Sequence, residues 1–469
     1  MLTQKTHIYF AGIGGIGMSA LAGICKKRGH IISGSDSNIE QKSIHKLIQL
    51  GCSITRQNEA FLANPKPDLL IYSTAISNNT PIMREALALG IRTIHRAELL
   101  SELTKQQKTI AITGAHGKTT TASMISHLFI SAHQDPTVVL GGFLESIDSN
   151  YLAGTGEWLI AEADESDRSM LKLHPNMIVI TNIDNEHLDT YKDADDMQAA
   201  FYQFLQTLHP HGNAIIFIDT PQTKNLIASA LSNIRARITT YGRSPEADFR
   251  ITNEQFTSSK SSAEIITPGN GTIAIQISQS GPHMIENASA ALISGYICGL
   301  SGQQCTEALA SFSGVEQRFT YRGTYRNAHI IDDYAHHPTE IAHALGTAQR
   351  YNPTKLIVVF QPQRYSRTQA LWNEFIEVFS KAAIDNLFIT DIYSASEKMQ
   401  DPNKNAAQLV REINTIRNDQ RAAYIPQDQG FGSVKKSIDE CIVPGSLILF
   451  LGAGKVNALA HELARADHI

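Results

Sequence analysis

Short apolar runs recur along the chain, and each ends in a loop of small, polar or charged residues that leads into a helical pattern. The clearest runs occupy residues 7–11, 109–112 and 328–331. Further runs of the same kind lie at residues 69–72, 158–161, 177–180, 356–360 and 447–451. A short apolar run between polar or turn residues is typical of a parallel strand that is covered on both faces. Strands that alternate with helices predict an α/β fold with open sheets, whose ligands bind beyond the carboxyl ends of the strands.

One stretch departs from this pattern. Residues 238–280 are rich in Ser, Thr and Gly, and apolar residues alternate with polar ones at 272–277. Alternation of this kind is typical of a half-buried strand, so we expect a small β-rich insertion before a helix that starts near His283. The whole pattern predicts three α/β domains with boundaries near residues 106 and 314. The predicted domains are residues 1–106, 107–314 and 315–469.

Composition narrows the class of protein. The chain has 469 residues and a formal net charge of −5, so it lacks the basic excess with which proteins displace counterions from nucleic acid. No apolar run approaches the roughly 18 residues of a membrane helix, and the N-terminus lacks the apolar segment of a signal peptide. The five cysteines are scattered without metal-ligand spacing. We therefore expect a soluble cytoplasmic protein with neither nucleic acid nor membrane as a partner. Composition does not set the oligomeric state, so a monomer and a homodimer both stay open.

The first loop of interest carries Gly12, Gly14 and Gly17 between an apolar run and a helical pattern, and Asp36 follows the next apolar run. In such a loop, glycines let the backbone approach a diphosphate at a helix N-terminus, and the acidic side chain is placed for a ribose or a base. The loop therefore predicts nucleotide or diphosphate binding, without saying which nucleotide. The alternative is a turn whose glycines serve only the close packing of a helix on a strand.

The second loop is more specific. Residues 114–121 read Gly-Ala-His-Gly-Lys-Thr-Thr-Thr and lie between an apolar run and a helical pattern. Its backbone N–H groups can surround a β-phosphate, while Lys118 reaches the β- and γ-phosphates and the Thr119 hydroxyl meets Mg²⁺. Ile112 stands where the full Gly-x-x-x-x-Gly-Lys pattern begins, so the loop is a shortened variant. The predicted ligand is ATP, and the alternative is a chance Gly-Lys-Thr at a helix start.

Acidic residues follow two of the predicted strands. Residues 162–167 read Glu-Ala-Asp-Glu-Ser-Asp, and residues 181–189 contain further carboxylates together with His187. Because the carboxyl ends of parallel strands meet at one edge of a sheet, these groups would complete a Mg²⁺ site beside the phosphates. The alternative is a solvated acidic turn with a structural histidine.

Three of the arginines in the later part of the chain are candidates for binding an anion. Arg318 is at the predicted domain junction, and Arg364 and Arg367 follow the apolar run 356–360. The guanidinium fork suits a substrate carboxylate or a developing phosphoryl charge. Surface salt bridges are an alternative that the spacing leaves equally open.

Together these segments resemble the Mur ligase family over essentially the whole chain. The resemblance rests on residues 12–19 (Gly-Ile-Gly-Gly-Ile-Gly-Met-Ser), 114–120, 162–167, 186–191 (Glu-His-Leu-Asp-Thr-Tyr), 317–319 (Gln-Arg-Phe) and 332–338 (Asp-Asp-Tyr-Ala-His-His-Pro), which follow the family's order. It implies a Rossmann-like first domain that binds a UDP-sugar and a central domain of P-loop ATPase type. It also implies a Rossmann-like third domain that helps to bind the nucleotide and an amino acid.

The resemblance also assigns roles to single residues. It implies that Lys118, Glu162, His187 and Arg318 are catalytic, and that Thr119, Glu162 and His187 serve the metal. The implied ATP contacts are Gly114, Ala115, His116, Gly117, Lys118, Thr119, Thr120, Asn287, Arg318, Asp333 and His336. The implied UDP-sugar contacts are Gly12, Gly14, Gly15, Gly17, Met18, Ser19, Asp36, Ser73 and Arg96. Arg364 and Arg367 are implied to hold the carboxylate of the amino acid.

The activity implied by the resemblance is an ATP- and Mg²⁺-dependent ligation in peptidoglycan precursor synthesis. It would join L-alanine to the lactyl carboxylate of UDP-N-acetylmuramate through an acyl phosphate. One alternative is a recycling ligase that attaches a preformed tripeptide to the same UDP-sugar. Alternatives from other classes are an NAD-dependent dehydrogenase that uses the first glycine loop and a regulatory ATP-binding module. The sequence identifies neither the group that accepts the proton of the amine nor the choice among L-Ala, Gly and L-Ser.

Overall fold

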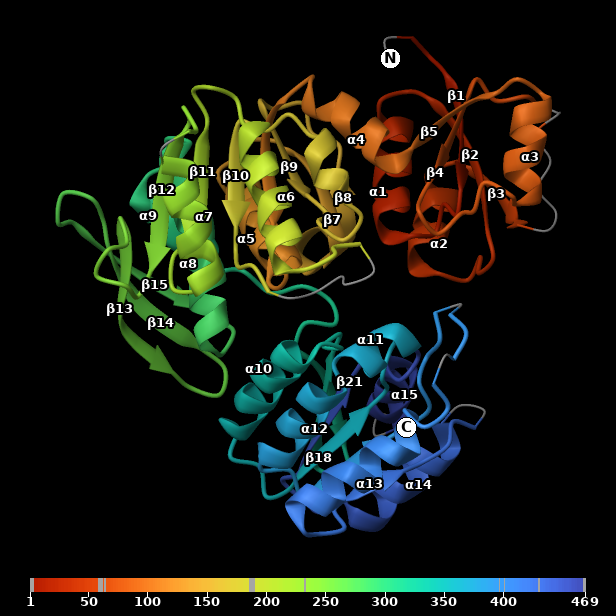
Figure 1. Ribbon diagram of the computed structural model, residues 1–469, viewed down its shortest axis with the longest axis vertical. Coiled ribbons are helices and arrows are strands. Elements are labelled where there is room, and N and C mark those ends of the chain that lie inside the picture. The colour runs from red at the N-terminus through yellow and green to blue at the C-terminus, as the bar shows by residue number, and fades with distance from the viewer. Residues whose placement is uncertain are drawn as a thin grey trace. The chain divides into compact units, whose positions relative to one another are not determined.

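The computed structural model is shown in Figure 1, and its two compact units are described separately. The first unit comprises residues 1–255, 262–278 and 282–315, and the second comprises residues 256–261, 279–281 and 316–469. The structure describes residues 4–57, 62, 65–184, 190–231, 233–395, 397–399, 401–428 and 431–466.

The first sheet is parallel throughout, in the order β3-β2-β1-β4-β5. Its strands are β1 (His7–Ala11), β2 (Ile31–Asp36), β3 (Ser53–Arg56), β4 (Leu69–Tyr72) and β5 (Arg92–His95). The helices beside it are α1 (Ile16–Lys27), α2 (Lys42–Gln49), α3 (Pro81–Ala88) and α4 (Arg96–Thr104). Alternate residues of β1 point to opposite faces: Ile8 and Phe10 pack with α1, α2 and α4, whereas Tyr9 and Ala11 pack with α3. Helices therefore cover both faces of a parallel sheet, the Rossmann-like arrangement that the sequence predicts.

The second sheet has the order β15-β14-β13-β12-β11-β10-β6-β9-β7-β8. Its first half comprises β6 (Lys108–Thr113), β7 (Thr137–Leu144), β8 (Ser149–Leu152), β9 (Trp158–Glu162), β10 (Met177–Ile180) and β11 (Asn213–Phe217). The helices are α5 (Lys118–Ser131), η2 (Glu145–Ile147), η3 (Ser169–Lys172), α6 (Ala194–Gln206), α7 (Pro221–Leu231), α8 (Pro282–Ile297) and α9 (Gly302–Ala310). Strand β6 is parallel to β10 on one side and to β9 on the other, so the loop after β6 lies between the ends of these two strands.

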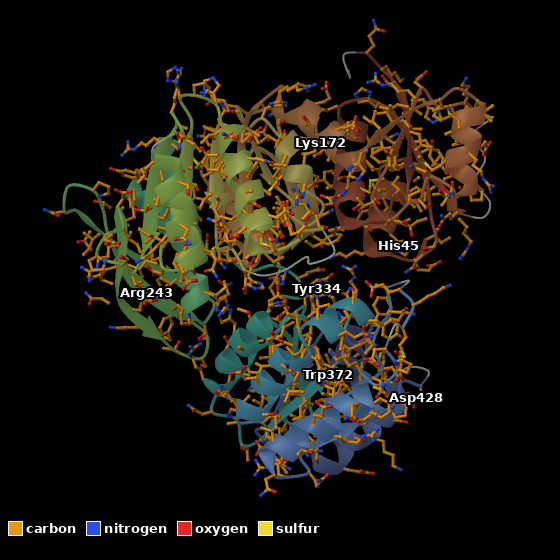
Figure 2. The ribbon with its side chains drawn as sticks, in the orientation of Figure 1. His45, Lys172, Arg243, Tyr334, Trp372 and Asp428 are labelled. Atoms are coloured by element: carbon orange, nitrogen blue, oxygen red, sulfur yellow. The ribbon has the colours of Figure 1, made fainter. Side chains whose placement is uncertain are left out.

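The β-rich stretch extends the same sheet. It forms β12 (Arg237–Gly242), β13 (Phe249–Phe256), β14 (Ser261–Ile266) and β15 (Thr272–Ile277). Arg243, labelled in Figure 2, ties this edge to α8: its guanidinium lies 2.7 Å from a carboxylate oxygen of Glu254 and 2.6 Å from one of Glu286. The predicted insertion is therefore an added edge of the central sheet, and α8 begins at Pro282, one residue before the expected start.

The sheet of the second unit has the order β16-β17-β21-β18-β19-β20. Its strands are β16 (Thr320–Tyr325), β17 (Ala328–Asp333), β18 (Leu356–Phe360), β19 (Asn386–Ile389), β20 (Ala422–Tyr424) and β21 (Leu447–Leu451). The helices are α10 (Pro338–Gln349), α11 (Tyr365–Ala370), α12 (Trp372–Lys381), α13 (Ala406–Arg417), α14 (Gly432–Cys441) and α15 (Asn457–Ala466). Only β16 is antiparallel to its neighbour among the described strands of this sheet, and it forms one edge.

Strand β21 shows why its apolar run is continuous. Leu449 packs in a cluster with α12 and α13, whereas Phe450 packs in the opposite cluster with α14 and α15. Trp372, labelled in Figure 2, belongs to the first of these clusters and is almost fully buried. A strand covered on both faces needs an apolar side chain at every position, so the runs seen in the sequence mark buried parallel strands.

One boundary differs from the prediction. Asp332 and Asp333 were expected in the loop after the apolar run 328–331, but both belong to β17. They are held in the parallel ladder with β21, opposite Phe450 and Leu451. Asp332 is also paired with Arg322 of β16, whose Nε lies 2.9 Å from a carboxylate oxygen. The ladder satisfies the backbone groups, and the ion pair with Arg322 compensates for the burial of the Asp332 carboxylate.

Candidate active site

The loop between β6 and α5 owes its shape to two glycines in the left-handed region. Gly114 has φ +132° and Gly117 has φ +80°. A Cβ atom at Gly117 would lie only 2.6 Å from Oδ1 of Asn287, and one at Gly114 would lie 2.3 Å from Oγ1 of Thr181. Gly117 is also the N-cap of α5, so the backbone of the loop lies at the positive, N-terminal end of a 14-residue helix. A tight loop at a helix N-terminus is a site for an anionic phosphate group.

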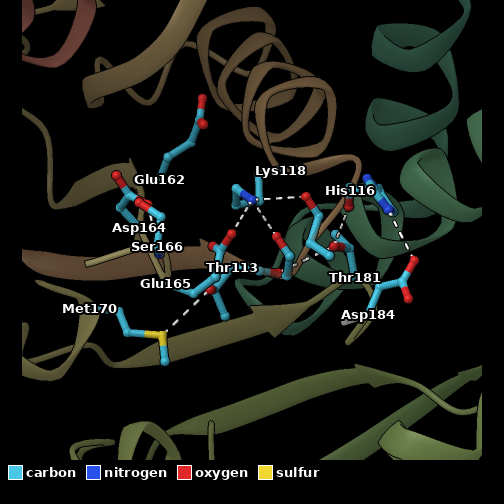
Figure 3. A network of polar contacts seen from close by, with 12 residues as sticks. Thr113, His116, Lys118, Glu162, Asp164, Glu165, Ser166, Met170, Thr181 and Asp184 are labelled. Carbon is cyan, nitrogen blue, oxygen red and sulfur yellow. Dashed lines mark hydrogen bonds and ion pairs between the residues drawn. The ribbon is translucent and has the colours of Figure 1, made fainter. Parts of the chain in front are cut away.

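Lys118 folds back over this loop, as Figure 3 shows. Its ammonium donates to the carbonyl oxygens of Gly114 and Ala115, the second at 3.0 Å. It also lies 2.7 Å from Oε1 of Glu165, which follows β9 and is almost completely buried. The acidic strand end and the phosphate loop therefore meet, as the parallel sheet predicts.

Thr119 and Glu162 form the second contact between these segments. The Thr119 hydroxyl donates to Oε2 of Glu162 at 3.0 Å, and the backbone N–H of Gly141 donates to the other carboxylate oxygen. A Cβ atom at Gly141 would lie 2.7 Å from this carboxylate, so a glycine is needed there. A hydroxyl beside a carboxylate is the kind of oxygen pair that Mg²⁺ prefers.

The end of β10 fixes the other side of the loop. Asn182 Oδ1 accepts from the backbone N–H of His116 at 2.8 Å, and its amide donates back to the His116 carbonyl at 3.0 Å. The Thr181 hydroxyl donates to the same carbonyl at 2.6 Å, and the His116 ring lies 3.3 Å from Asp184. Thr181 and Asn182 are not among the predicted site residues, although both belong to the segment 181–189 that was predicted to serve the site.

The other predicted ATP contacts of this domain lie close to the loop. Thr120 is buried at the start of α5. Asn287, on α8, accepts from the Thr121 hydroxyl at 3.1 Å and packs against Gly117. The structure thus brings Asn287 to the phosphate loop, while its expected contact with adenine stays a prediction.

In the first domain, Asp36 closes the glycine loop. Gly12 has φ +75°, and Oδ2 of Asp36 accepts from the backbone N–H of Gly14 at 2.8 Å. Gly15 precedes α1, while Met18 and Ser19 are buried within it. Asp36 is therefore bonded to the loop itself, and its contact with a ribose or base stays a prediction.

Arg96 begins α4 and reaches the acidic segment after β9. Its Nη2 lies 2.7 Å from Oδ2 of Asp164 and 3.4 Å from Oδ2 of Asp167. Ser73, which follows β4, is half-buried. The predicted UDP-sugar contacts therefore lie at the carboxyl ends of β1, β2, β4 and β5.

In the second unit, Asp333 organises the predicted nucleotide contacts. Its carboxylate accepts from the backbone N–H groups of Phe319 at 2.9 Å and Ala335 at 2.6 Å. Burial raises the pKa of Asp333 to about 7, although the Arg318 guanidinium and these N–H groups act in the opposite direction. Arg318 itself lies over the Tyr334 ring at 5.3 Å.

His336 and two residues with left-handed backbone lie close to Asp333. His336 Nδ1 lies 2.9 Å from the Tyr334 carbonyl and 3.6 Å from Glu340. On both sides of Arg318 the backbone is left-handed, with φ +59° at Gln317 and +48° at Phe319. Left-handed conformations are costly for side chains of this size, and the Asp333 carboxylate helps to hold this one.

Arg364 and Arg367 lie at the start of α11. Arg364 has φ +67°, and its Nε lies 2.5 Å from Oε1 of Glu397. The same carboxylate accepts from the backbone N–H of Ser366 at 3.0 Å, and Arg367 donates to Gln363 at 2.8 Å. Glu397 is a part of this cluster that sequence analysis missed, because no local pattern links it to Arg364.

Three family models match the chain in succession. The model of the Mur ligase family catalytic domain matches residues 7–108, the Mur ligase middle domain matches residues 112–295, and the glutamate ligase domain of Mur ligases matches residues 317–454.

The chain belongs to the Mur ligase family. It is an enzyme, an ATP-dependent ligase with the three-domain α/β architecture of that family. The dehydrogenase and the regulatory ATP-binding module are therefore set aside. In the part of the chain that the structure describes, no helix is long and apolar enough to cross a membrane.

Curated relatives are similar over the full length of this Mur ligase. UDP-N-acetylmuramate–L-alanine ligase of Syntrophus aciditrophicus is 38% identical over 99% of this chain and 94% of its own. The protein of the same name from Nitratidesulfovibrio vulgaris is 37% identical over 100% of both chains. Such similarity extends the family assignment to every domain.

Solved structures share the fold. The UDP-N-acetylmuramate–alanine ligase of Thermotoga maritima has a TM-score of 0.80 at 24% identity, with 99% of both chains covered. A murein peptide ligase of Psychrobacter arcticus has a TM-score of 0.73 at 22% identity, with 98% of both chains covered.

His187 lies outside the described residues, so its predicted place at the metal remains untested. Among the described residues, the structure brings Lys118, Thr119 and Glu162 together with the loop 114–117. It gathers Arg318, Asp333 and His336 at one corner of the second unit.

Proposed function

We propose that this Mur ligase joins L-alanine to the lactyl carboxylate of UDP-N-acetylmuramate, with ATP converted to ADP and phosphate, in peptidoglycan precursor synthesis. The observation that carries the proposal is the full-length similarity to relatives that bear this activity in their name, at 34–38% identity over 97–100% of the chain. The cytoplasm, where UDP-sugars and ATP occur together, is the proposed compartment, and the proposed active form is a monomer or homodimer.

The chemistry begins with a poor electrophile. A carboxylate resists attack by an amine, so a carboxylate oxygen first attacks the γ-phosphorus of ATP and displaces ADP. The amine nitrogen of L-alanine then adds to the carbonyl carbon of the acyl phosphate, and the tetrahedral intermediate expels phosphate as the amide forms. The amine loses its proton in this second step.

Lys118 is proposed to neutralise the charge that develops on the transferred phosphoryl group. Its ammonium already lies among carbonyl and carboxylate oxygens at the mouth of the phosphate loop. Arg318 is proposed to add a second positive charge. Fixed cations of this kind stabilise a phosphoryl transition state because they need little reorganisation.

Thr119 and Glu162 fit a bound Mg²⁺, because their hydroxyl and carboxylate oxygens lie 3.0 Å apart beside the phosphate loop. These two residues, with His187, are proposed to hold the ion, which when bound shields the phosphate charges of ATP. The carboxylate is oriented by the Gly141 backbone N–H in any case, so the pair is held in place by the protein itself.

The remaining roles follow the division into domains 1–106, 107–314 and 315–469. The first is proposed to bind the UDP-sugar through the loop 12–19, Asp36, Ser73 and Arg96. The central domain is proposed to bind ATP through residues 114–120 and Asn287. The third domain is proposed to add Arg318, Asp333 and His336 to the nucleotide, and Arg364 and Arg367 to the amino-acid carboxylate.

A phosphate-release assay with the purified full-length chain tests this function. The assay pairs UDP-N-acetylmuramate or UDP-N-acetylglucosamine with L-alanine, glycine, L-serine or a muropeptide-type tripeptide, in the presence of ATP and Mg²⁺. We expect release that depends on both UDP-N-acetylmuramate and L-alanine, and the ligated product by mass spectrometry. Preference for the tripeptide would assign the recycling activity instead.

The Lys118→Ala variant tests the proposed mechanism in the same assay. Loss of the ammonium is expected to lower kcat by about 10²–10³-fold, the usual cost of removing one group that stabilises transition-state charge. Lys105→Ala is the matched control, because Lys105 is an exposed lysine paired only locally with Glu102 in the described structure. Near-normal ligation by Lys118→Ala at saturating ATP would refute the proposed mechanism.

A further inference from the structure

One guanidinium lies between the first and central domains of the first unit. Arg96 belongs to α4 of the first domain, and its Nη2 contacts Asp164 at 2.7 Å and Asp167 at 3.4 Å in the central domain. The three side chains are partly shielded from water, with exposed fractions of 25% for Arg96, 34% for Asp164 and 16% for Asp167. An ion pair that is partly shielded from water is screened less by salt than a surface pair.

The same guanidinium covers the start of α1. A Cβ atom at Gly17 would lie 3.1 Å from Nη1 of Arg96. Nη1 therefore faces the glycine loop, while Nη2 faces the acidic loop. Only the planar fork of arginine presents two nitrogens to two neighbours in fixed directions.

Asp164 connects the Arg96 guanidinium to the acidic segment that contacts the phosphate loop. The Asp164 carboxylate, which Arg96 contacts, also accepts from the backbone N–H of Ser166 at 3.0 Å. Its neighbour in sequence, Glu165, is the residue that pairs with Lys118.

Further contacts hold the two domains together at the same place. The amide of Asn150, on β8, donates to the Ile16 carbonyl and, at 3.1 Å, to the Ser19 hydroxyl. Tyr151 packs so closely on α1 that a Cβ atom at Gly23 would lie 2.1 Å from its ring. The first turn of α1 is therefore fixed to the central domain by direct contacts.

We propose that Arg96 is a positioning residue that couples the glycine loop of the first domain to the phosphate loop of the central domain, so that an anionic diphosphate ligand at one loop and ATP at the other strengthen each other's binding. The inference rests on the proposed function, which places a UDP-sugar at the glycine loop. A diphosphate beside Nη1 fixes the guanidinium in the orientation that holds Asp164 through Nη2. The gain in binding free energy from this fixed guanidinium then contributes to the binding of both ligands. Each ligand therefore raises the affinity of the other by the same factor.

Calorimetry on the full-length chain tests the coupling. A non-hydrolysable ATP analogue with Mg²⁺ is titrated in the absence and in the presence of saturating UDP-N-acetylmuramate. We expect the UDP-sugar to tighten analogue binding by at least about fivefold in the native sequence, and the analogue to tighten UDP-sugar binding by the same factor. In Arg96→Gln, Asp164→Asn and the double variant, we expect the ratio to fall to about one, with no added loss in the double variant.

Arg96→Lys separates charge from geometry. The ammonium keeps the charge but cannot face both loops, so we expect the coupling ratio to fall to about one while each ligand still binds. Lys172→Gln is the matched control: Lys172, labelled in Figure 2, forms an exposed pair with Glu98 between the same two domains, at 3.5 Å. Thermal unfolding of each variant confirms that it is folded.

The outcomes separate the two proposals. If the native chain binds both ligands but shows no coupling, or if Arg96→Lys keeps the native ratio, the coupling is refuted and the proposed function stands. If the native chain fails to bind UDP-N-acetylmuramate, the proposed function falls and the coupling falls with it.

Discussion

The Glu165 carboxylate lies 2.7 Å from the Lys118 ammonium and is only 2% exposed. A buried carboxylate therefore neutralises the lysine of the phosphate loop from inside the protein. A phosphate group that binds this lysine competes with Glu165 and is also repelled by it. The pair thus sets how strongly the loop attracts an anion.

Replacement of Glu165 should tighten ATP binding. In Glu165→Gln the ammonium keeps a hydrogen-bond acceptor but loses its charged partner, and the repulsion of the phosphates disappears. A charged hydrogen bond is worth about 1.5–3 kcal/mol, so we expect the KM for ATP to fall by about tenfold. Initial rates of phosphate release at varied ATP measure this. Glu157→Gln removes a comparable partner from the remote, exposed Lys108 and should leave the KM unchanged; a higher KM in Glu165→Gln would contradict the argument.

The oxygen pair at the loop should set the magnesium requirement. We expect Glu162→Gln and Thr119→Val each to raise the Mg²⁺ concentration for half-maximal rate by at least about tenfold, because each removes an oxygen of the proposed site. Rates are measured against Mg²⁺ at fixed ATP. Thr306→Val, on the exposed surface of α9, is the control for loss of a threonine hydroxyl. An unchanged Mg²⁺ curve in Glu162→Gln would exclude that residue from the metal site.

Glu397 should act on the amino acid through Arg364. The carboxylate holds the Arg364 side chain and the backbone N–H of Ser366, and it thereby fixes a left-handed residue at the start of α11. We expect Glu397→Gln to raise the KM for L-alanine by about tenfold while the KM for ATP changes little, since only one hydrogen-bonded charge is lost. Glu377→Gln, which breaks an exposed pair on α12, serves as control. Equal changes in both constants would indicate a general structural role instead.

The stability of the second unit should depend on the ionisation of Asp333. Its pKa is raised to about 7 by burial, so the native state favours the protonated form relative to the unfolded chain, where the pKa is near 4. The resulting stabilisation is complete below about pH 4 and is lost as the pH rises to 7, with a slope of at most about 1.4 kcal/mol per pH unit.

Denaturant unfolding of Asp333→Asn and the native sequence, both in a Trp158→Phe background, measures this effect. Trp372 is then the fluorescence reporter, since the chain has two tryptophans and Trp372 lies in the core of the second unit. We expect the stability of the native sequence relative to Asp333→Asn to decline from pH 4 to pH 7. A constant difference across this range would show that Asp333 does not titrate there.

Much of the site follows from the sequence because parallel strands deliver their ends to one edge. The rule places residues 114–121 beside the acidic segment 162–167, and the contacts of Lys118 and Thr119 agree with it. Continuous apolar runs likewise predict buried strands, since each residue of β21 faces a helix layer.

Contacts that depend on how separate loops pack could not be predicted. Glu397 contacts Arg364 although the two residues are 33 positions apart in the sequence. Arg364 also adopts a left-handed backbone conformation that no local sequence pattern predicts. Gln361 is a similar case: its buried side chain accepts from the backbone N–H groups of Lys455 and Val456, which shapes the turn after β21. In both cases the partner is selected by tertiary packing and not by local propensity.

The position of β21 has a consequence for the synthesis of the chain. It is the last strand in sequence, yet it lies between β17 and β18 in the middle of its sheet. While the ribosome has not yet released residues 447–451, β17 and β18 lack the strand that joins them, whereas both sheets of the first unit are already complete. A chain that terminates before residue 447 would therefore lack the strand that joins β17 to β18, so the second unit completes its sheet later in synthesis than the first unit.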